Sequence, residues 1–277
     1  MPWGTLYIVA TPLGHLGDLS ARAGSTLTSV PVVAAEDTRR TRQLLSHLDA
    51  HPRLLSYHAH SEPGRLSAIL EILQGGEDVA LVSDAGTPGV SDPGAALVAA
   101  AHAAGAPVVP IPGGSAVTAA ISASGLGGDR YLFLGFLPRK GAERRRLLEQ
   151  AARSEWTVVL FEAPRRVVAL LDDLAEFAGS SRQVVVAREL TKLYEEVRSD
   201  TLEGHRAYWT GQEPRGEFTI VLAGSEPAAD PAPEVDPTVA VRELLAQGLS
   251  PRAAAAEVAQ RLGLSRNEAY RLVLACK

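Results

Sequence analysis

Residues 83–94 read SDAGTPGVSDPG and follow an apolar run at residues 79–83 that is typical of a buried strand. They place glycine and proline between the end of that strand and a helical pattern at residues 95–104, which Gly105 closes. A loop without bulky side chains at a strand end lets the backbone come close to a ligand. We therefore expect residues 83–94 to border a binding cleft.

Two further loops have the same composition and the same place in the pattern, residues 11–14 (TPLG) and residues 111–115 (IPGGS). Strand patterns occur at residues 5–10, 30–35, 54–57 and 108–111, and the first and last of them lead directly into these two loops. Their alternation with helical patterns predicts an α/β fold with a mostly parallel sheet. A tight turn explains any one loop alone, but ligands bind outside the carboxyl ends of parallel strands. We predict that all three loops line one cleft.

The rest of the chain divides into three parts. Residues 125–128 are glycine-rich and separate a first lobe, residues 1–124, from a second α/β lobe, residues 129–224. Residues 225–237 carry four prolines and four acidic residues and are expected to form a stiff exposed linker. The pattern of residues 238–277 predicts a small C-terminal pair of helices. The pair resembles a helix-turn-helix that binds nucleic acid, but two helices that only pack on the main body explain the pattern equally well.

Composition limits the class of protein. The 277 residues are 46% hydrophobic and include one cysteine, Cys276, so a disulfide framework and a cysteine zinc site are excluded. The apolar runs are shorter than the roughly 20 residues that a membrane helix needs. The apolar start of the chain lacks the basic region of a secretory signal. We expect a cytoplasmic protein with no membrane partner.

The net charge of −5 argues against indiscriminate nucleic-acid binding. At physiological salt, however, charges are screened beyond about 8 Å, so a phosphate responds to a local cluster of charges. Arginine and lysine cluster in three places, around residues 39–42, 139–146 and 165–166. Taken alone, each cluster is typical of a solvated helix face, and its position beside the loops is what favours binding.

Residues 83–94 also carry a resemblance, together with residues 7–18 (YIVATPLGHLGD), 35–42 (AEDTRRTR), 135–140 (GFLPRK) and 187–196 (ARELTKLYEE). They closely resemble the RsmI family, whose members are 16S ribosomal RNA cytidine 2′-O-methyltransferases with the tetrapyrrole-methylase fold. The resemblance covers nearly the whole chain. It implies a two-lobed enzyme, commonly a homodimer, that binds S-adenosylmethionine between its lobes and has a mixed sheet in its second lobe. Its partner would be 16S rRNA or the assembled small ribosomal subunit.

The resemblance also implies a set of cofactor-contacting positions. In this sequence they are Pro12, Ala85, Gly86, Thr87, Val90, Ser115, Ala116, Glu162 and Leu190. The chain departs from the family pattern at His15, where Asn is usual, and at residues 161–166, FEAPRR, where the family has Tyr-Glu-Ser-Pro-His-Arg. No role of that tyrosine or that histidine is carried over to this chain.

The chemistry expected from the residues agrees with a methyltransferase. A sulfonium methyl donor needs no metal and no covalent nucleophile, and neither motif occurs in the sequence. Alignment of donor and hydroxyl can supply about 7–11 kcal/mol of the barrier, whereas a general base supplies roughly 10²–10⁴-fold in rate. Two residues at strand ends are candidate bases, Asp37 and His58. Asp37 alternatively caps a helix or pairs with Arg39, and His58 is as readily structural.

The basic side chains beside the loops are candidates for holding RNA phosphates, which arginine forks suit well. They are Arg39, Arg40, Arg42, Arg139, Lys140, Arg144, Arg145 and Arg146. An enclosed cleft admits single-stranded or splayed RNA but not an intact duplex. Two other functions remain open at this point: a tetrapyrrole (precorrin-type) methyltransferase of the same fold, and a non-catalytic RNA-binding protein that acts through its terminal helices.

Overall fold

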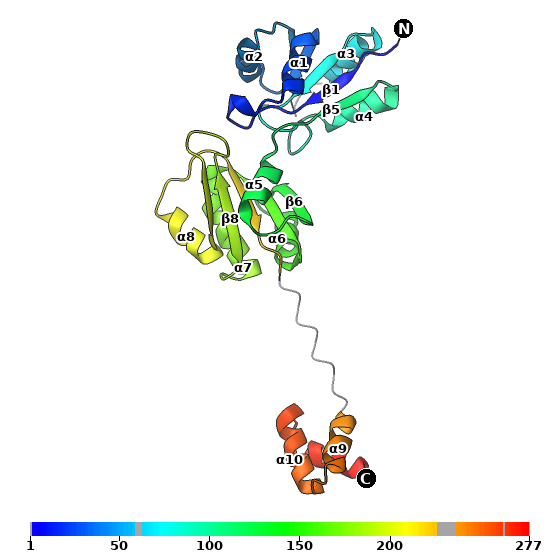
Figure 1. The fold of residues 1–277 in the computed structure, drawn as a ribbon, viewed down its shortest axis with the longest axis vertical. Coiled ribbons are helices and arrows are strands. Elements are labelled where there is room, and N and C mark those ends of the chain that lie inside the picture. The colour runs from blue at the N-terminus through cyan, green and yellow to red at the C-terminus, as the bar shows by residue number, and fades with distance from the viewer. Residues whose placement is uncertain (1, 59–62, 226–236, 263, 277) are drawn as a thin grey trace. The chain divides into compact units, whose positions relative to one another are not determined.

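The computed structural model describes residues 2–58, 63–225, 237–262 and 264–276. The chain forms two compact units, Met1–Ser225 and Glu226–Lys277, each of which is described by itself (Figure 1). Most of the predicted linker, residues 226–236, lies outside the described residues. Its first residue, Ser225, belongs to the first unit, because its backbone N–H donates to Ser154 O at 2.7 Å.

The first lobe is built on an all-parallel sheet of five strands. The strands are β1 (Leu6–Val9), β2 (Val32–Ala35), β3 (Arg53–Ser56), β4 (Val79–Val82) and β5 (Val108–Ile111). Their order across the sheet is β3-β2-β4-β1-β5. This confirms the predicted parallel sheet. Because every strand runs the same way, all five carboxyl ends lie along one edge.

Helices cover both faces of this sheet. Side chains of β2 alternate between the faces, so that Val33 packs in a cluster with Leu27 while Val32 packs in a second cluster with Leu97. The first cluster lies under α1 (Ala21–Ser29) and α2 (Thr38–His47), and the second under α3 (Pro63–Gln74) and α4 (Ala95–Ala104). Burial on both faces explains why these short strands read as unbroken apolar runs.

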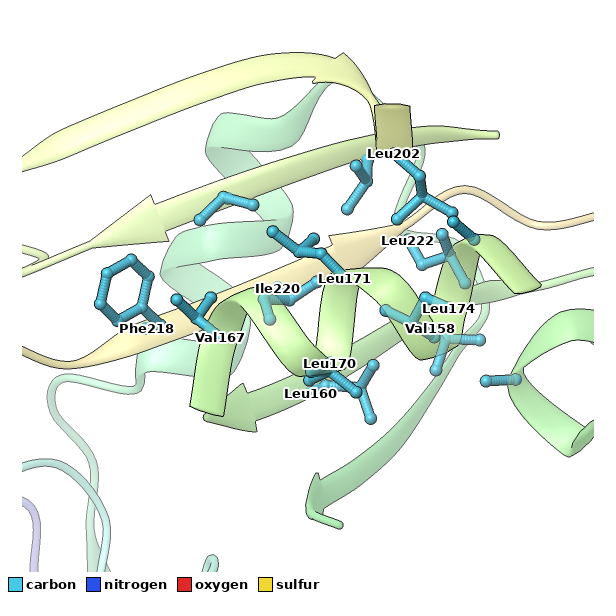
Figure 2. Close-up of a cluster of buried hydrophobic side chains, with 14 of the residues drawn as sticks. Val158, Leu160, Val167, Leu170, Leu171, Leu174, Leu202, Phe218, Ile220 and Leu222 are labelled. Atoms are coloured by element: carbon cyan, nitrogen blue, oxygen red, sulfur yellow. The ribbon is translucent and has the colours of Figure 1, made fainter. Parts of the chain in front are cut away.

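The second lobe contains a mixed five-stranded sheet, as predicted. Its strands are β6 (Tyr131–Phe136), β7 (Thr157–Glu162), β8 (Gln183–Arg188), β9 (Glu196–Thr201) and β10 (Phe218–Leu222). They are ordered β6-β7-β10-β8-β9, and only the β6–β7 pair among them is parallel. Figure 2 shows the core on one face, where Leu170, Leu171 and Leu174 of α7 (Val167–Ala178) lie against β7 and β10. Helices α6 (Ala142–Arg153) and α8 (Leu202–Thr210) contribute to the same core.

Helix α5 (Ala116–Ser124) covers the opposite face of the second sheet. Its Val117 and Ala120 pack against Val159, Val185 and Val221, although α5 directly follows β5 of the first sheet in the chain. Helix α5 therefore packs on the second sheet, although the predicted first lobe extends to residue 124. The apolar side of α5 is matched to the outer face of the second sheet, and this pairing is not visible in the local sequence pattern.

The described residues of the C-terminal unit form three helices where a pair was predicted. The predicted pair is α10 (Pro251–Leu262) and α11 (Arg266–Ala275), and the expected capping box of Ser265 and Glu268 is present. The additional helix α9 (Pro237–Ala246) places Val241 in one core with Val258 and Val273. Across both units, the described part of the chain contains no helix with the length and apolar character to span a bilayer.

Candidate functional site

The three glycine- and proline-bearing loops meet at the carboxyl edge of the first sheet. Thr11 and Gly86 exchange backbone hydrogen bonds of 2.9 and 3.1 Å, which join the loop after β1 to the loop after β4. The Thr87 hydroxyl donates to Gly114 O at 3.3 Å, which joins the loop after β4 to the loop after β5. The prediction that these loops share one cleft is confirmed.

Glycine is required at the centre of this junction. Gly86 has φ +79°, a conformation that side chains other than glycine adopt at a cost. A Cβ atom at Gly86 would also lie 3.3 Å from the Leu13 side chain, and one at Gly113 would lie 3.0 Å from the Ala10 Cβ. The backbones of the three loops therefore approach one another as closely as glycine permits.

A cavity of about 460 Å³ opens between these loops and the second sheet. Phe136 and Phe161 line it from the second sheet, and Leu13 from the loop after β1. Seven of the predicted cofactor-contacting residues line the cavity: Ala85, Gly86, Thr87, Val90, Ser115, Ala116 and Glu162. Such a volume, with mixed apolar and polar walls, suits a small-molecule ligand.

The other two predicted cofactor positions, Pro12 and Leu190, do not line this cavity. Pro12 stands between Thr11, which bridges to Gly86, and Leu13, which does line it. Leu190 packs against the apolar cluster beneath α5. The structure thus brings seven of the nine positions together around one cavity, whereas Leu190 packs in the apolar cluster beneath α5.

Carboxylates dominate the charged part of the lining. Glu36, Asp84, Asp92, Glu162 and Glu217 line the cavity, and Arg40 is the cationic residue among the lining residues that the structure describes. Burial raises the pKa of Glu36, and the charge of Asp84 adds to that increase. Sequence reasoning missed four of these acids, although Glu36 directly follows β2 and Asp84 is the second residue after β4, and both could have been found on that signal.

Asp92 differs from the other acids of this group in its proton affinity. Its side chain is half-buried in the loop after β4, and burial, followed by the charges of Glu36, Asp84 and Glu217, raises its pKa to about 6. A hydrogen bond with the Ser83 side chain works in the opposite direction. The outcome is a carboxyl group on the cavity wall that titrates close to neutral pH.

Glu162 is a buried acid at the end of β7. Its Oε1 accepts from Ala163 N–H at 2.8 Å, and its Oε2 lies 3.0 Å from Arg166 Nη2. That Nη2 also donates to Leu137 O at 2.7 Å, and Oε2 makes no hydrogen bond of good geometry among the residues that the structure describes. Burial raises the pKa of Glu162 despite the Arg166 charge. Glu162 is therefore a buried carboxylate beside the cavity, held by one backbone N–H and one ion pair.

The two predicted bases lie outside the lining. Asp37 is the N-cap of α2, accepting from Arg39 N–H at 2.8 Å, and its carboxylate also pairs with the Arg39 guanidinium. These contacts with Arg39 lower the pKa of Asp37 to about 2. This is the helix-cap and ion-pair role that the sequence left open, and it gives Asp37 little proton affinity. His58 is exposed at the end of β3, near enough to Glu36 for their charges to interact.

The predicted RNA-binding side chains separate into two groups. Arg144 is largely buried, pairs with Asp173 and donates to Pro138 O at 2.9 Å, so its guanidinium is occupied within the fold. Arg39, Arg40 and Arg145 make ion pairs with Asp37, Asp84 and Glu149, but their side chains remain exposed. The others are exposed and form no ion pair within the described residues: Arg42, Arg139, Lys140 and Arg146.

Comparison with known proteins identifies the family. The model of the tetrapyrrole (corrin/porphyrin) methylases matches residues 5–204, and that of the RsmI C-terminal HTH domain matches residues 231–277. The chain belongs to the RsmI family of tetrapyrrole methylases. It is 46% identical to a Synechocystis protein named ribosomal RNA small subunit methyltransferase I, over 98% of each chain. A protein of the same name from Xylella fastidiosa is also 46% identical, over 96% of this chain and 98% of that one.

Solved structures support the same fold for this RsmI-family chain. A cobalt precorrin-4 methyltransferase superposes with a TM-score of 0.62 at 19% identity, covering 79% of this chain and 94% of its own. A uroporphyrin-III C-methyltransferase from Thermus thermophilus, complexed with S-adenosyl homocysteine, gives a TM-score of 0.59 at 20% identity, with 79% and 97% covered. At these identities the likeness establishes the tetrapyrrole-methylase fold and carries no substrate.

Proposed function

We propose that this protein transfers a methyl group from S-adenosylmethionine to the ribose 2′-hydroxyl of a cytidine in 16S rRNA of the small ribosomal subunit. The observation that carries the proposal is the near-full-length identity of 46% to relatives named ribosomal RNA small subunit methyltransferase I. The structure supports it with a cavity of suitable size, lined by seven of the nine positions that the family resemblance implied for the cofactor.

The charge of the cavity suits a sulfonium compound. Five carboxylates and one arginine line it, so the walls favour a cationic ligand over a polyphosphate. The N-terminus of α5 opens on the same cavity through Ser115 and Ala116, and Ser115 makes no side-chain capping bond there. Uncapped N–H groups at a helix start favour an anion. S-Adenosylmethionine carries both kinds of charge, a cationic sulfonium and an amino-acid group that bears an ammonium and a carboxylate on one carbon.

The reaction depends first on alignment. The cofactor supplies an electrophilic methyl group on sulfur, and the protein must hold the hydroxyl oxygen in line with it. The joined loops at Thr11, Gly86 and Gly114 are rigidly connected, so they hold a ligand in one orientation. Correct positioning can supply about 7–11 kcal/mol of the barrier. We therefore assign the main catalytic contribution to the backbone of these loops.

For RNA, we propose a contact surface made by the exposed basic side chains on either side of the cavity. These are Arg39, Arg40 and Arg42 of α2 on the first lobe, and Arg139, Lys140, Arg145 and Arg146 on the second. Arg144 is left out because Asp173 and Pro138 occupy its guanidinium. Phe136, which lines the cavity and is 54% exposed, offers a ring on which a splayed base can stack.

A methylation assay tests the proposed function. Purified protein and S-adenosylmethionine should add one methyl group to 16S rRNA, in assembled small subunits or naked RNA, and mass spectrometry of fragments should place it on a cytidine ribose. A precorrin-type substrate offered in parallel should not be methylated. Methylation of that substrate alone would support the tetrapyrrole alternative. Absence of any transfer, with RNA binding retained, would support a non-catalytic RNA-binding protein.

Neutralising the basic surface should weaken RNA binding without affecting the cofactor. In an Arg139→Gln/Lys140→Gln double variant, we expect RNA affinity to fall. The slope of log affinity against log salt should decrease by about 1 for each phosphate that the protein no longer neutralises. The dissociation constant for S-adenosylmethionine should stay within twofold. Arg153→Gln, at the far end of α6, is the matched control and should leave the slope unchanged. An unchanged slope in the double variant would remove these residues from the RNA surface.

We also propose that the enzyme is a homodimer and that it works in the cytoplasm, where small ribosomal subunits are. Two observations support the dimer. Leu193 and Tyr194, between β8 and β9, are 88% and 68% exposed, and β9 is an edge strand with unpaired backbone groups. A second copy of the chain that covers these side chains and lies along β9 explains both observations. Sedimentation velocity at micromolar concentration should give the mass of a dimer, and a monomer mass would contradict this assignment.

A further inference from the structure

The C-terminal part of the chain differs from the rest in its charge. Residues 238–277 contain six basic and three acidic residues, a net charge of +3, whereas the whole chain carries −5. Such an asymmetry within one chain is typical of a segment that contacts nucleic acid. Because charges are screened beyond about 8 Å, binding depends on where these basic side chains gather.

Helix α11 presents two of them on one side. Its Ala269 and Val273 are buried in the core of the C-terminal unit, which fixes the side of the helix that faces away. Residues spaced by three and four positions share a helix face. The exposed residues with this spacing form the α11 face: Arg266, Asn267, Tyr270, Arg271 and Leu274.

The arginines of the α11 face are not held by acids. Arg266 and Arg271 form no ion pair within the described part of the chain. The acid of the same helix, Glu268, accepts from Ser265 N–H at 3.1 Å and from Ser265 Oγ at 2.6 Å. These two bonds lower the pKa of Glu268 most, and the nearby charge of Arg271 adds to the effect. Both guanidinium groups are therefore available to an anion.

The α11 face also carries an aromatic ring. Tyr270 is the only aromatic residue among residues 238–277, and it is 44% exposed. The neighbouring helices offer less to a nucleic acid. On α9, Arg242 is followed directly by Glu243. On α10, Arg261 pairs with Glu257 at 3.0 Å. The α11 face thus combines a ring with two unpaired cations, and neither α9 nor α10 has a ring.

This combination fits unpaired RNA better than a duplex. The major groove of an RNA duplex is too deep and narrow for side chains to read, so a helix cannot use it as it uses the major groove of DNA. Unpaired bases, by contrast, stack on aromatic side chains, and arginine forks hold the phosphates beside them.

We propose that the α11 face binds an unpaired segment of 16S rRNA, with Tyr270 stacked on a base and Arg266 and Arg271 on phosphates. The inference deepens the proposed function and rests on it for the identity of the RNA. Since both units belong to one chain, binding by one raises the effective concentration of RNA for the other. The α11 face therefore contributes to substrate affinity, while methyl transfer takes place at the cavity.

Replacement of Tyr270 in the full-length protein tests the stacking. For Tyr270→Ala, we expect the dissociation constant for naked 16S rRNA to rise about 5- to 100-fold, the range for loss of one stacked base. Tyr270→Phe keeps the ring and should bind within twofold of the wild type. In methylation of small subunits by Tyr270→Ala, KM should rise while kcat stays within twofold, because the cavity is unchanged.

The phosphate contacts are tested by an Arg266→Gln/Arg271→Gln double variant. The slope of log affinity against log salt should decrease by about 1.4, which is 0.7 for each phosphate of a single strand. Arg261→Gln is the matched control, because it removes a positive charge from the same unit whose guanidinium is already paired with Glu257. It should leave the slope unchanged. All of these variants should bind S-adenosylmethionine within twofold of the wild type.

Several results would overturn the assignment. Equal RNA affinity of Tyr270→Ala and Tyr270→Phe, or an unchanged slope in the double variant, would remove the α11 face from the RNA contact. A loss seen with assembled subunits but not with naked 16S rRNA would assign the face to a protein partner. Tighter binding of duplex DNA than of unpaired RNA would assign it to DNA.

Failure of the proposed function has a different signature. If the wild type transfers no methyl group but loses RNA affinity on the Tyr270→Ala change, the methyltransferase proposal fails and the α11 contact stands. If the wild type methylates 16S rRNA and the α11 variants keep its KM and salt slope, the methyltransferase proposal stands and the α11 contact fails.

Discussion

A Gly86→Val variant should lose most of its affinity for S-adenosylmethionine, with a dissociation constant raised at least 100-fold. Gly86 has φ +79°, and a β-branched residue is strongly disfavoured there. The new Cβ would also press on the Leu13 side chain, 3.3 Å away. To relieve the strain the loop must change conformation, which breaks the two hydrogen bonds with Thr11 and displaces the backbone that lines the cavity. A 100-fold loss corresponds to about 2.7 kcal/mol of binding free energy.

Isothermal titration calorimetry with S-adenosylmethionine measures this effect, and a second glycine provides the control. Gly105 has φ +80° at the end of α4, and nothing lies within 4 Å of a Cβ placed there. Gly105→Val therefore introduces similar backbone strain outside the cavity lining, and it should bind the cofactor within twofold of the wild type. Normal binding by Gly86→Val would show that the loop after β4 is not part of the cofactor site.

Glu162→Gln should weaken cofactor binding by about 10- to 100-fold without destabilising the fold. Glu162 is among the residues that line the cavity, and its buried carboxylate, 3.0 Å from Arg166 Nη2, places a negative charge next to the ligand. The amide retains the shape of the side chain and can still accept from Ala163 N–H. It removes the negative charge. Charge-assisted hydrogen bonds are about twice as strong as neutral ones, which accounts for the size of the loss.

Thermal unfolding distinguishes a functional from a structural role of Glu162. Burial raises its pKa above 4.5, so the ionised carboxylate opposes folding and its contribution becomes less favourable as pH increases. Glu162→Gln should therefore have an equal or higher unfolding temperature at pH 7.5. Glu149→Gln, which removes a surface partner of Arg145, is the control and should leave affinity unchanged. A large drop in unfolding temperature with unaltered affinity would assign Glu162 to the ion pair with Arg166 instead.

The elements that were predicted well are those whose own sequence carries the signal. The central strands β2 and β4 of the first sheet are buried on both faces and form continuous apolar runs, and α4 ends at Gly105, whose φ of +80° suits glycine. Strand β9, by contrast, reads EVRSDT, and its charged side chains are half-buried in ion pairs, Glu196 with Arg188 and Arg198 with Asp200, which no apolar pattern predicts. Helix α9 begins at Pro237, the last residue of the predicted linker, and its core contacts lie on the other two helices of its unit.

The candidate site also has parts that the local sequence predicted and parts that it did not. Glycine and proline at three strand ends predicted the loops and the cavity, since backbone conformation depends on the local residue type. Position at a strand end also points to Glu36 and Asp84, but the local pattern does not show that Asp92 and Glu217 line the same cavity. The sequence favoured Asp37 over its neighbour Glu36, but the turn into α2 directs Asp37 toward Arg39, and Glu36 into the cavity lining. Arg144 looked equivalent to its neighbours Arg145 and Arg146, but it is the one that is buried against Asp173.

The sequence by itself determined the parallel first sheet and the converging glycine loops, because short-range patterns of apolar, glycine and proline residues act through local backbone preference and burial. Its longer motifs determined the family, and with it the mixed second sheet. Tertiary structure decided the placement of α5 on the second sheet and the environment of Asp92. Both depend on groups far apart in the chain, and the proton affinity of a carboxyl group is set by the burial and charges that those distant groups impose.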